Sequence, residues 1–116
     1  MQYDEESELT RYVWDHYLPL VTDFERRVGT AIIWRQKAVA SGSPQMARTF
    51  GKTDDPEIGF ALSEGAEAFR RRVRGRLLVE HAGEVFVNRC PNCERVVRTP
   101  RAQQCLWCGH DWHEPK

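Results

Sequence analysis

The feature that most constrains this chain is the segment CPNCERVVRTPRAQQCLWC, residues 90–108, which holds all four cysteines in two C-x-x-C pairs. Within each pair the two intervening residues let the chain turn back, so that both sulfurs face the same point. The residues between the pairs can bring the second turn opposite the first, and four thiolates placed in this way can surround one ion tetrahedrally. We therefore predict one structural Zn²⁺ bound by Cys90, Cys93, Cys105 and Cys108.

Other uses of the same sulfurs remain open. A pair of disulfides is one alternative, although paired cysteines bind metal more often than they form disulfides in a reducing compartment. Iron is a second alternative, because four thiolates hold iron in the same geometry. His110 and His113 follow the last cysteine closely and are alternative ligands. Since four cysteines already complete the shell, we expect a supporting role for both histidines.

The two cysteine motifs, CPNC and CLWCGH, resemble the knuckles of rubredoxin-like zinc ribbons. The resemblance covers about residues 84–113, and it implies a metal site without implying an activity. One departure is Glu94, where such knuckles often place a glycine after the second cysteine. The whole chain is also similar to small bacterial-type proteins that join a helical front to a ribbon tail, and this similarity brings no activity with it.

Apolar spacing predicts a helical front. Apolar residues recur at helical intervals over residues 5–18, from residue 20 to the SGSP at 41–44, and from 63 to Gly83. Residues 41–57 are rich in Gly, Ser, Pro and Asp, so we expect a loop there. These features predict a helical region over residues 1–83, with two or three helices before a third, basic one.

The C-terminal residues 84–116 have the pattern of a small β module. EVFVN, residues 84–88, alternates as a strand does, RVVRT at 95–99 supplies β-branched residues, and PRAQQ at 100–104 supplies a turn and return. A segment of about 30 residues cannot bury enough apolar surface to fold without a staple. We therefore predict an α+β fold in which a C-terminal zinc-ribbon β-hairpin follows the helices.

Charge is unevenly distributed although the chain is formally neutral. Residues 1–69 carry 7 basic and 12 acidic side chains, a balance of −5, and residues 70–116 carry 10 basic and 5 acidic ones, a balance of +5. The basic half can attract nucleic acid or another polyanion, or it can pair with the acidic half or with a partner protein. The candidate anion contacts are Arg70, Arg71, Arg72, Arg74, Arg76, Arg98 and Arg101.

The sequence indicates a binding protein rather than an enzyme. HAGE at 81–84 differs from the H-x-E signature of zinc deaminases, and it lies too close to Cys90 for that fold. The acidic N-terminus, MQYDEESELT, lacks the apolar core of a signal peptide, and no apolar run is long enough to span a membrane, so we expect a cytoplasmic protein.

The leading hypothesis is a non-enzymatic zinc-binding protein that binds a partner protein or itself, with no small-molecule substrate. Nucleic-acid binding through the arginine helix and the ribbon is the alternative.

Overall fold

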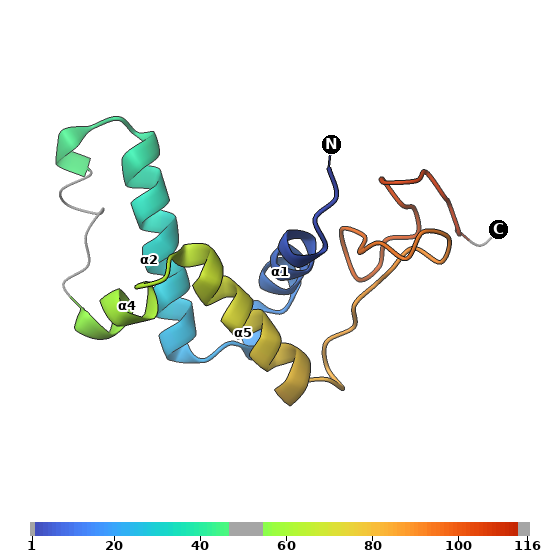
Figure 1. Cartoon of the computed structure of the whole chain (residues 1–116), viewed down its shortest axis with the longest axis horizontal. Coiled ribbons are helices and arrows are strands. Elements are labelled where there is room, and N and C mark those ends of the chain that lie inside the picture. Colours follow the sequence, from blue (N-terminus) through green and yellow to red (C-terminus); the bar gives the residue numbers. More distant parts are fainter. Residues whose placement is uncertain (1, 47–54, 114–116) are drawn as a thin grey trace. The chain divides into compact units, whose positions relative to one another are not determined.

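The computed structural model describes residues 2–46 and 55–113 (Figure 1). Its helices are α1 (Glu5–His16), the 3-10 helix η1 (Leu18–Leu20), α2 (Asp23–Ala40), α4 (Pro56–Ala61) and α5 (Ala66–Glu80). The predicted helical front is confirmed. Residues 47–54 of the expected loop lie outside the described residues, and the end of that loop is helical, because α4 begins at Pro56.

Local signals in the sequence explain where these helices begin. The Asp4 side chain accepts the amide protons of Glu6 and Ser7 at the start of α1. Thr22 and Glu25 form a capping box at the start of α2, with each side chain bonded to the other residue's backbone N–H. Asp55 caps α4 in the same way as Asp4 caps α1. Each cap satisfies amide groups that the first helical turn leaves without partners.

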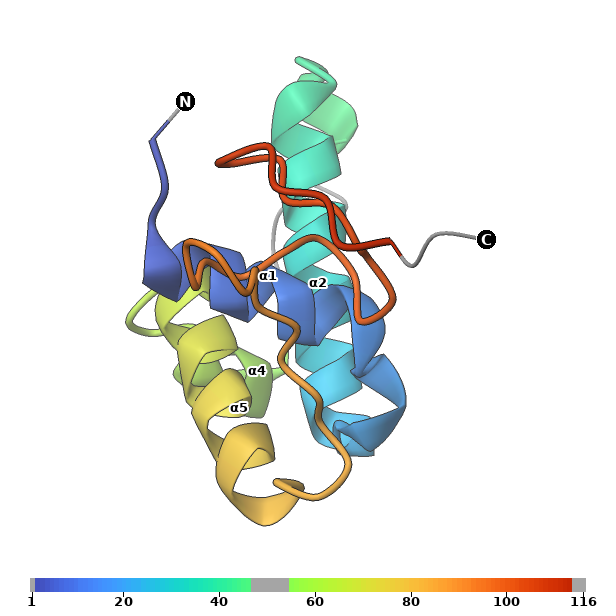
Figure 2. The same cartoon turned by 90° about the vertical axis from the view of Figure 1, so that its right-hand side faces the viewer.

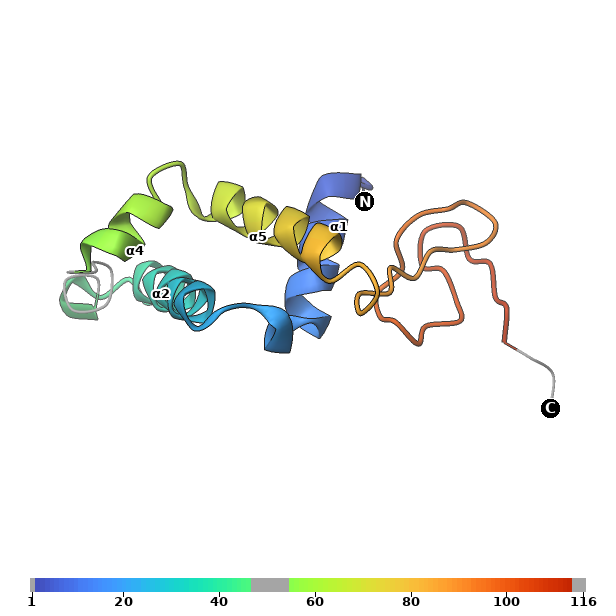
Figure 3. The ribbon, with the colours of Figure 1, turned by 90° about the horizontal axis from the view of Figure 1, so that it is seen from below.

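The predicted β-hairpin is wrong. Within the described residues there is no strand, only the isolated antiparallel bridges Arg89–Val96 and Gln104–Asp111. Figure 3 draws residues 84–113, here called the C-terminal segment, as two successive loops (orange to red). The fold is therefore helical with an irregular metal-site segment, and it is not α+β.

Tyrosines explain why EVFVN does not pair as a strand. The Phe86 amide donates to Tyr17 Oη at 3.0 Å, and the Asn88 amide donates to Tyr12 Oη at 3.2 Å. The buried Asn88 amide needs an acceptor, which Tyr12 of α1 supplies, and the exposed Phe86 amide bonds the residue that follows α1, Tyr17. Residues 84–88 are therefore held against the end of α1 by bonds from their backbone to tyrosine hydroxyls, and they do not form a ladder with another strand (Figure 2).

The chain divides into two compact units, and the boundary between Val73 and Arg74 falls inside α5. One unit is formed by the described residues of 1–20 and 74–116, with Tyr12, Val13 and Leu77 among its buried side chains. The other unit is formed by the described residues of 21–73. Its buried side chains include Val28, Ile32, Ile58 and Phe69. The predicted boundary between residues 83 and 84 stays a prediction.

None of the helices in the described ranges combines the length and the apolar composition that a membrane crossing requires.

Candidate metal centre

The four predicted cysteines converge on one point. Their Sγ atoms all lie within 4.8 Å of one another, with 3.6 Å between Cys90 and Cys108 and 3.7 Å between Cys93 and Cys105. A tetrahedral ion with metal–sulfur bonds of about 2.3 Å requires sulfur–sulfur distances of about 3.8 Å. A disulfide requires about 2.05 Å, and all four thiols are free. The four cysteines therefore fit one tetrahedral metal ion.

The two C-x-x-C motifs fold as the same turn. The amide of Cys90 donates to Arg95 O at 2.9 Å, and fifteen residues later the amide of Cys105 donates to His110 O at 2.8 Å. The reverse bonds match as well, from Glu94 N to Cys90 O at 2.8 Å and from Gly109 N to Cys105 O at 3.0 Å. The flanking bridges Arg89–Val96 and Gln104–Asp111 keep the same offset. Two equivalent knuckles thus present two sulfurs each.

Backbone amides point at the sulfurs in both knuckles. The Asn92 amide donates to Cys90 Sγ at 3.4 Å, and the Trp107 amide donates to Cys105 Sγ at 3.3 Å. The Asn92 side-chain amide adds a bond to Cys108 Sγ at 3.6 Å. Hydrogen bonds of this kind favour the thiolate, which is the form that binds metal. Asn92 is therefore a supporting residue that the cysteine spacing alone does not reveal.

These hydrogen bonds change the acidity of the thiols unequally. The backbone amide of His110, followed by the Asn92 side chain, lowers the pKa of Cys108 to about 6. For Cys93, a backbone hydrogen bond from Arg95 lowers the pKa, but burial and the neighbouring thiols outweigh it and raise the pKa to about 11. Because the four sulfurs are so close, a negative charge on one opposes a negative charge on the next. A cation at the centre removes that conflict.

The site is half shielded from solvent. Cys90 and Cys105 are buried, Cys93 is half-buried and Cys108 is exposed. The apolar side chains packed around them are Val97, Ala102, Trp107 and Trp112. Neither His110 nor His113 belongs to the ligand cluster. Instead His110 stacks on Trp112, and His113 pairs with Asp111 at 2.6 Å.

Three tyrosines join the C-terminal segment to the N-terminal residues. Tyr12 and Tyr17 bond the backbone of residues 86–88, as described above, and Tyr3 Oη accepts the Val96 amide proton at 3.0 Å. The Tyr3 ring also meets Trp107 edge-on, with 4.9 Å between centroids. The predicted helix over residues 5–18 includes Tyr12 and Tyr17 but not Tyr3, and its periodicity does not indicate that the hydroxyl groups have partners more than sixty residues away.

An ion pair adds to this attachment. Arg89 donates to both carboxylate oxygens of Glu5, at 3.0 and 2.7 Å. The hydrogen bond from Arg89 is the main cause that lowers the pKa of Glu5 from its ordinary value. Both side chains are partly exposed, so the pair contributes at most about 1 kcal/mol.

Glu94 occupies a backbone position that suits glycine. Its φ is 66°, and the equivalent residue of the second knuckle, Gly109, has a φ of 80°. A residue with a Cβ is strained in this left-handed region by about 1–2 kcal/mol. No heavy atom lies within 4 Å of a Cβ built at Gly109, so its glycine is required by backbone conformation and not by close packing. The first knuckle therefore carries strain that the second one lacks.

Replacing Glu94 with glycine will stabilise the protein. Relief of the left-handed strain outweighs the greater freedom of glycine in the unfolded chain, and we expect a gain of about 0.5–1 kcal/mol. The measurement is the urea unfolding midpoint at saturating zinc. Gly109→Ala is the matched control and should lose about 1 kcal/mol. A loss of stability in Glu94→Gly as large as that in the control would contradict the explanation.

Most of the predicted anion-binding arginines face carboxylates of the same chain. Four of them form ion pairs at 2.5–3.4 Å: Arg71 with Glu67, Arg72 with Glu64, Arg74 with Glu6 and Arg76 with Glu80. Arg74 is largely buried and bonds α1, as expected if the basic half neutralises the acidic one. Arg70 is half-buried, and Arg98 and Arg101 are exposed. Contact of these arginines with an external anion stays a prediction.

Comparisons with protein-family models, with curated proteins and with solved structures give no match to this chain. The functional conclusion therefore rests on the chain's own residues, and above all on four cysteine sulfurs gathered at metal-binding distance.

Proposed function

We propose that this is a non-enzymatic zinc-binding protein, in which one Zn²⁺ holds the C-terminal segment in shape and thereby builds a surface for a protein partner. The observation that carries the proposal is the convergence of four free thiols in a segment that has no strand among its described residues. Beyond Val85, the backbone bonds of this segment lie within each knuckle or in the turn between them, and among its described residues none joins one knuckle to the other. A metal that crosslinks residues 90–93 to residues 105–108 supplies the missing restraint.

A closed ligand set supports a structural role for the metal. Catalytic zinc sites keep one position for water or substrate, whereas four cysteines leave no such position. The backbone amides directed at the sulfurs stabilise thiolate charge and add no group able to transfer a proton. The proposal is therefore binding without catalysis.

Nucleic-acid binding through residues 70–76 is the less favoured alternative. The ion pairs of Arg71, Arg72, Arg74 and Arg76 already balance much of the charge that would attract phosphates. Breaking those ion pairs costs part of the free energy that a phosphate contact provides. Residues 70–76 therefore attract a polyanion less strongly than their sequence indicates.

Metal content tests the zinc proposal. Elemental analysis of the purified full chain should find one zinc per chain, and the protein should be colourless, because iron bound by thiolates absorbs visible light. Zinc should be lost in the double variant Cys90→Ser/Cys93→Ser. The double variant His110→Ala/His113→Ala is the control and should retain its zinc, since neither histidine is a ligand. Iron in place of zinc, or no tightly bound metal, would refute the proposal.

A further inference from the structure

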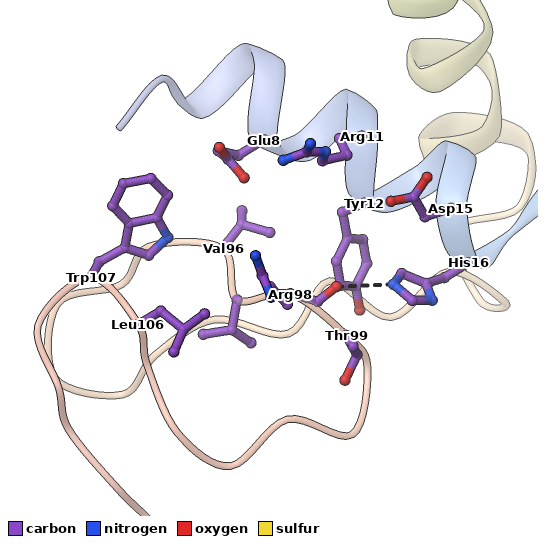
Figure 4. A pocket seen from close by; sticks show the side chains of 11 residues that line it. Glu8, Arg11, Tyr12, Asp15, His16, Val96, Arg98, Thr99, Leu106 and Trp107 are labelled. Atoms are coloured by element: carbon purple, nitrogen blue, oxygen red, sulfur yellow. Dashed lines mark hydrogen bonds between the residues drawn. The ribbon is translucent and has the colours of Figure 1, made fainter. Parts of the chain in front are cut away.

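A second site lies beside the metal centre. A pocket of about 390 Å³ opens between α1 and the C-terminal segment, and none of the four cysteines lines it (Figure 4). At one end His16 Nε2 is 2.9 Å from Arg98 O, a hydrogen bond that ties the two walls together. A cavity of this size suits a small group of side chains or a ligand of modest size.

Charged side chains of both walls meet in this pocket without ion pairs. Glu8, Arg11 and Asp15 line it from α1, at positions that share one helix face, and Arg98 lines it from the opposite wall. In the part of the chain that the structure describes, none of these four side chains forms an ion pair. The arginines of α5 behave differently, because their charges are met by neighbouring carboxylates. The guanidinium groups of Arg11 and Arg98 thus remain available to an incoming carboxylate.

The same pocket has an apolar side. Trp107 and Leu106, the two residues inside the second knuckle, line it together with the buried Val96 and Val97. Leu106 is 60 % exposed, which leaves a large apolar side chain in water at the edge of the pocket. A partner that covers Leu106 gains the free energy of burying that surface.

We propose that this pocket binds a short segment of a partner protein in which an acidic side chain stands next to a large apolar one. The acidic side chain is held between Arg11 and Arg98, and the apolar side chain covers Leu106 beside Trp107. This inference rests on the proposed function, because the metal shapes the knuckle that carries Leu106 and Trp107.

The flanking carboxylates decide against nucleic acid as the occupant. Glu8 and Asp15 lie on either side of Arg11 along α1, one helical turn before it and one after it. A single carboxylate can reach Arg11 between them, whereas a strand with regularly repeated phosphates would meet both negative charges. The pocket therefore selects an isolated acidic group and disfavours a polyanion.

Selection from a display library of short random peptides tests the proposal. The bait is the zinc-loaded full chain, and the expected result is enrichment of peptides that place Asp or Glu beside Leu, Phe or Trp. The best synthetic peptide is then titrated against variants whose zinc content has been checked. Arg98→Glu should weaken binding at least about tenfold, because a charge-assisted hydrogen bond is replaced by repulsion. Arg101→Glu changes the charge equally outside the pocket and should leave the affinity nearly unchanged.

A second variant guards against misfolding of the first. Leu106→Ala removes an exposed side chain and should lower affinity several-fold with zinc content intact. No enriched peptide, enrichment of basic peptides, or equal losses in Arg98→Glu and Arg101→Glu would overturn the proposal. Labelled RNA or DNA bound in an Arg98-dependent manner would overturn it in favour of a polyanion. If the protein holds one zinc and the peptide selection fails, only this inference falls; if the protein holds no zinc, the proposed function itself falls.

Discussion

Replacing Cys105 with serine will release the metal and disorder the C-terminal segment. Cys105 is fully buried at the centre of the site, and serine cannot supply the thiolate that the ion requires. Structural zinc contributes an apparent free energy of about 10–16 kcal/mol in isolated finger peptides, which is as large as the net stability of a whole domain, about 5–15 kcal/mol. The tyrosine hydrogen bonds and the Arg89–Glu5 pair contribute about 1 kcal/mol each, so we expect residues 84–113 to lose their order with the metal.

Amide NMR spectra measure this result directly. In the zinc-loaded protein the amides of residues 84–113 should be dispersed, and in Cys105→Ser they should collapse to the narrow range of an unfolded chain. Removing zinc from the unmodified protein with a chelator should give the same collapse, which separates loss of metal from an effect of the serine itself. Helices α2 and α4, which belong to the other compact unit, should keep their dispersed amides. If the amide signals of residues 84–113 stayed fully dispersed in the metal-free protein, zinc would not be what keeps these residues ordered.

The parts of this structure that sequence predicts well are those fixed by neighbours in the chain. The helices follow from apolar spacing over a few turns. Their starts are fixed by Asp4 and Thr22, which cap amides two or three residues away, and the predicted start at residue 20 is wrong because α2 begins after Thr22. The cysteine cluster follows from the C-x-x-C spacing, because each pair needs only one turn to face its sulfurs inward. The caps span two or three residues and the sulfur contacts between knuckles span 12 and 18 residues, so a pattern within one short stretch of sequence carries the information.

The failed strand prediction has the opposite origin. EVFVN has the alternation of a strand, but its amides bond to Tyr12 and Tyr17, which lie about seventy residues earlier. The sequence of residues 84–88 does not indicate that the hydroxyl groups of Tyr12 and Tyr17 accept these hydrogen bonds. The ion pair between Arg74 and Glu6 also joins residues that are far apart in the chain. From the sequence, Arg74 could equally be solvated, paired with a carboxylate or bound to a phosphate. Contacts between segments that are distant in the sequence determine both the backbone structure of residues 84–88 and the partner of Arg74.

Glu94 is a feature that the sequence predicts only in part. Its position after the second cysteine marks it in the sequence as a departure from the glycine of similar knuckles. The consequence of that departure, a left-handed φ of 66° in a turn otherwise equivalent to that of Gly109, is visible only in the structure. The turn forms despite the strain, and the Glu94 amide donates to Cys90 O at 2.8 Å within it.

Removing the hydroxyl of Tyr12 is the second change with a large expected effect. Tyr12 is 2 % exposed, and its Oη donates to Phe86 O while accepting the amide proton of Asn88. The hydroxyl keeps its proton at neutral pH, as an ordinary tyrosine does, and can therefore serve as donor and acceptor at once. Burial is the main reason that its pKa rises further, to about 12. Tyr12→Phe keeps the ring and opens no large cavity. It leaves the Asn88 amide without its acceptor.

The cost of Tyr12→Phe is concentrated at that amide. Phe86 O retains a second donor, Tyr17 Oη at 3.1 Å, whereas Asn88 is buried and water cannot easily replace the lost hydroxyl. An unsatisfied buried donor costs about 1–3 kcal/mol, and we expect a loss of that size in the free energy of unfolding at saturating zinc. Hydrogen exchange at the Asn88 amide should accelerate correspondingly. Tyr17→Phe is the matched control, because the Phe86 amide is exposed to solvent and can bond water instead. Equal losses in the two variants would mean that the attachment of the metal-site segment depends on ring packing rather than on the buried hydroxyl of Tyr12.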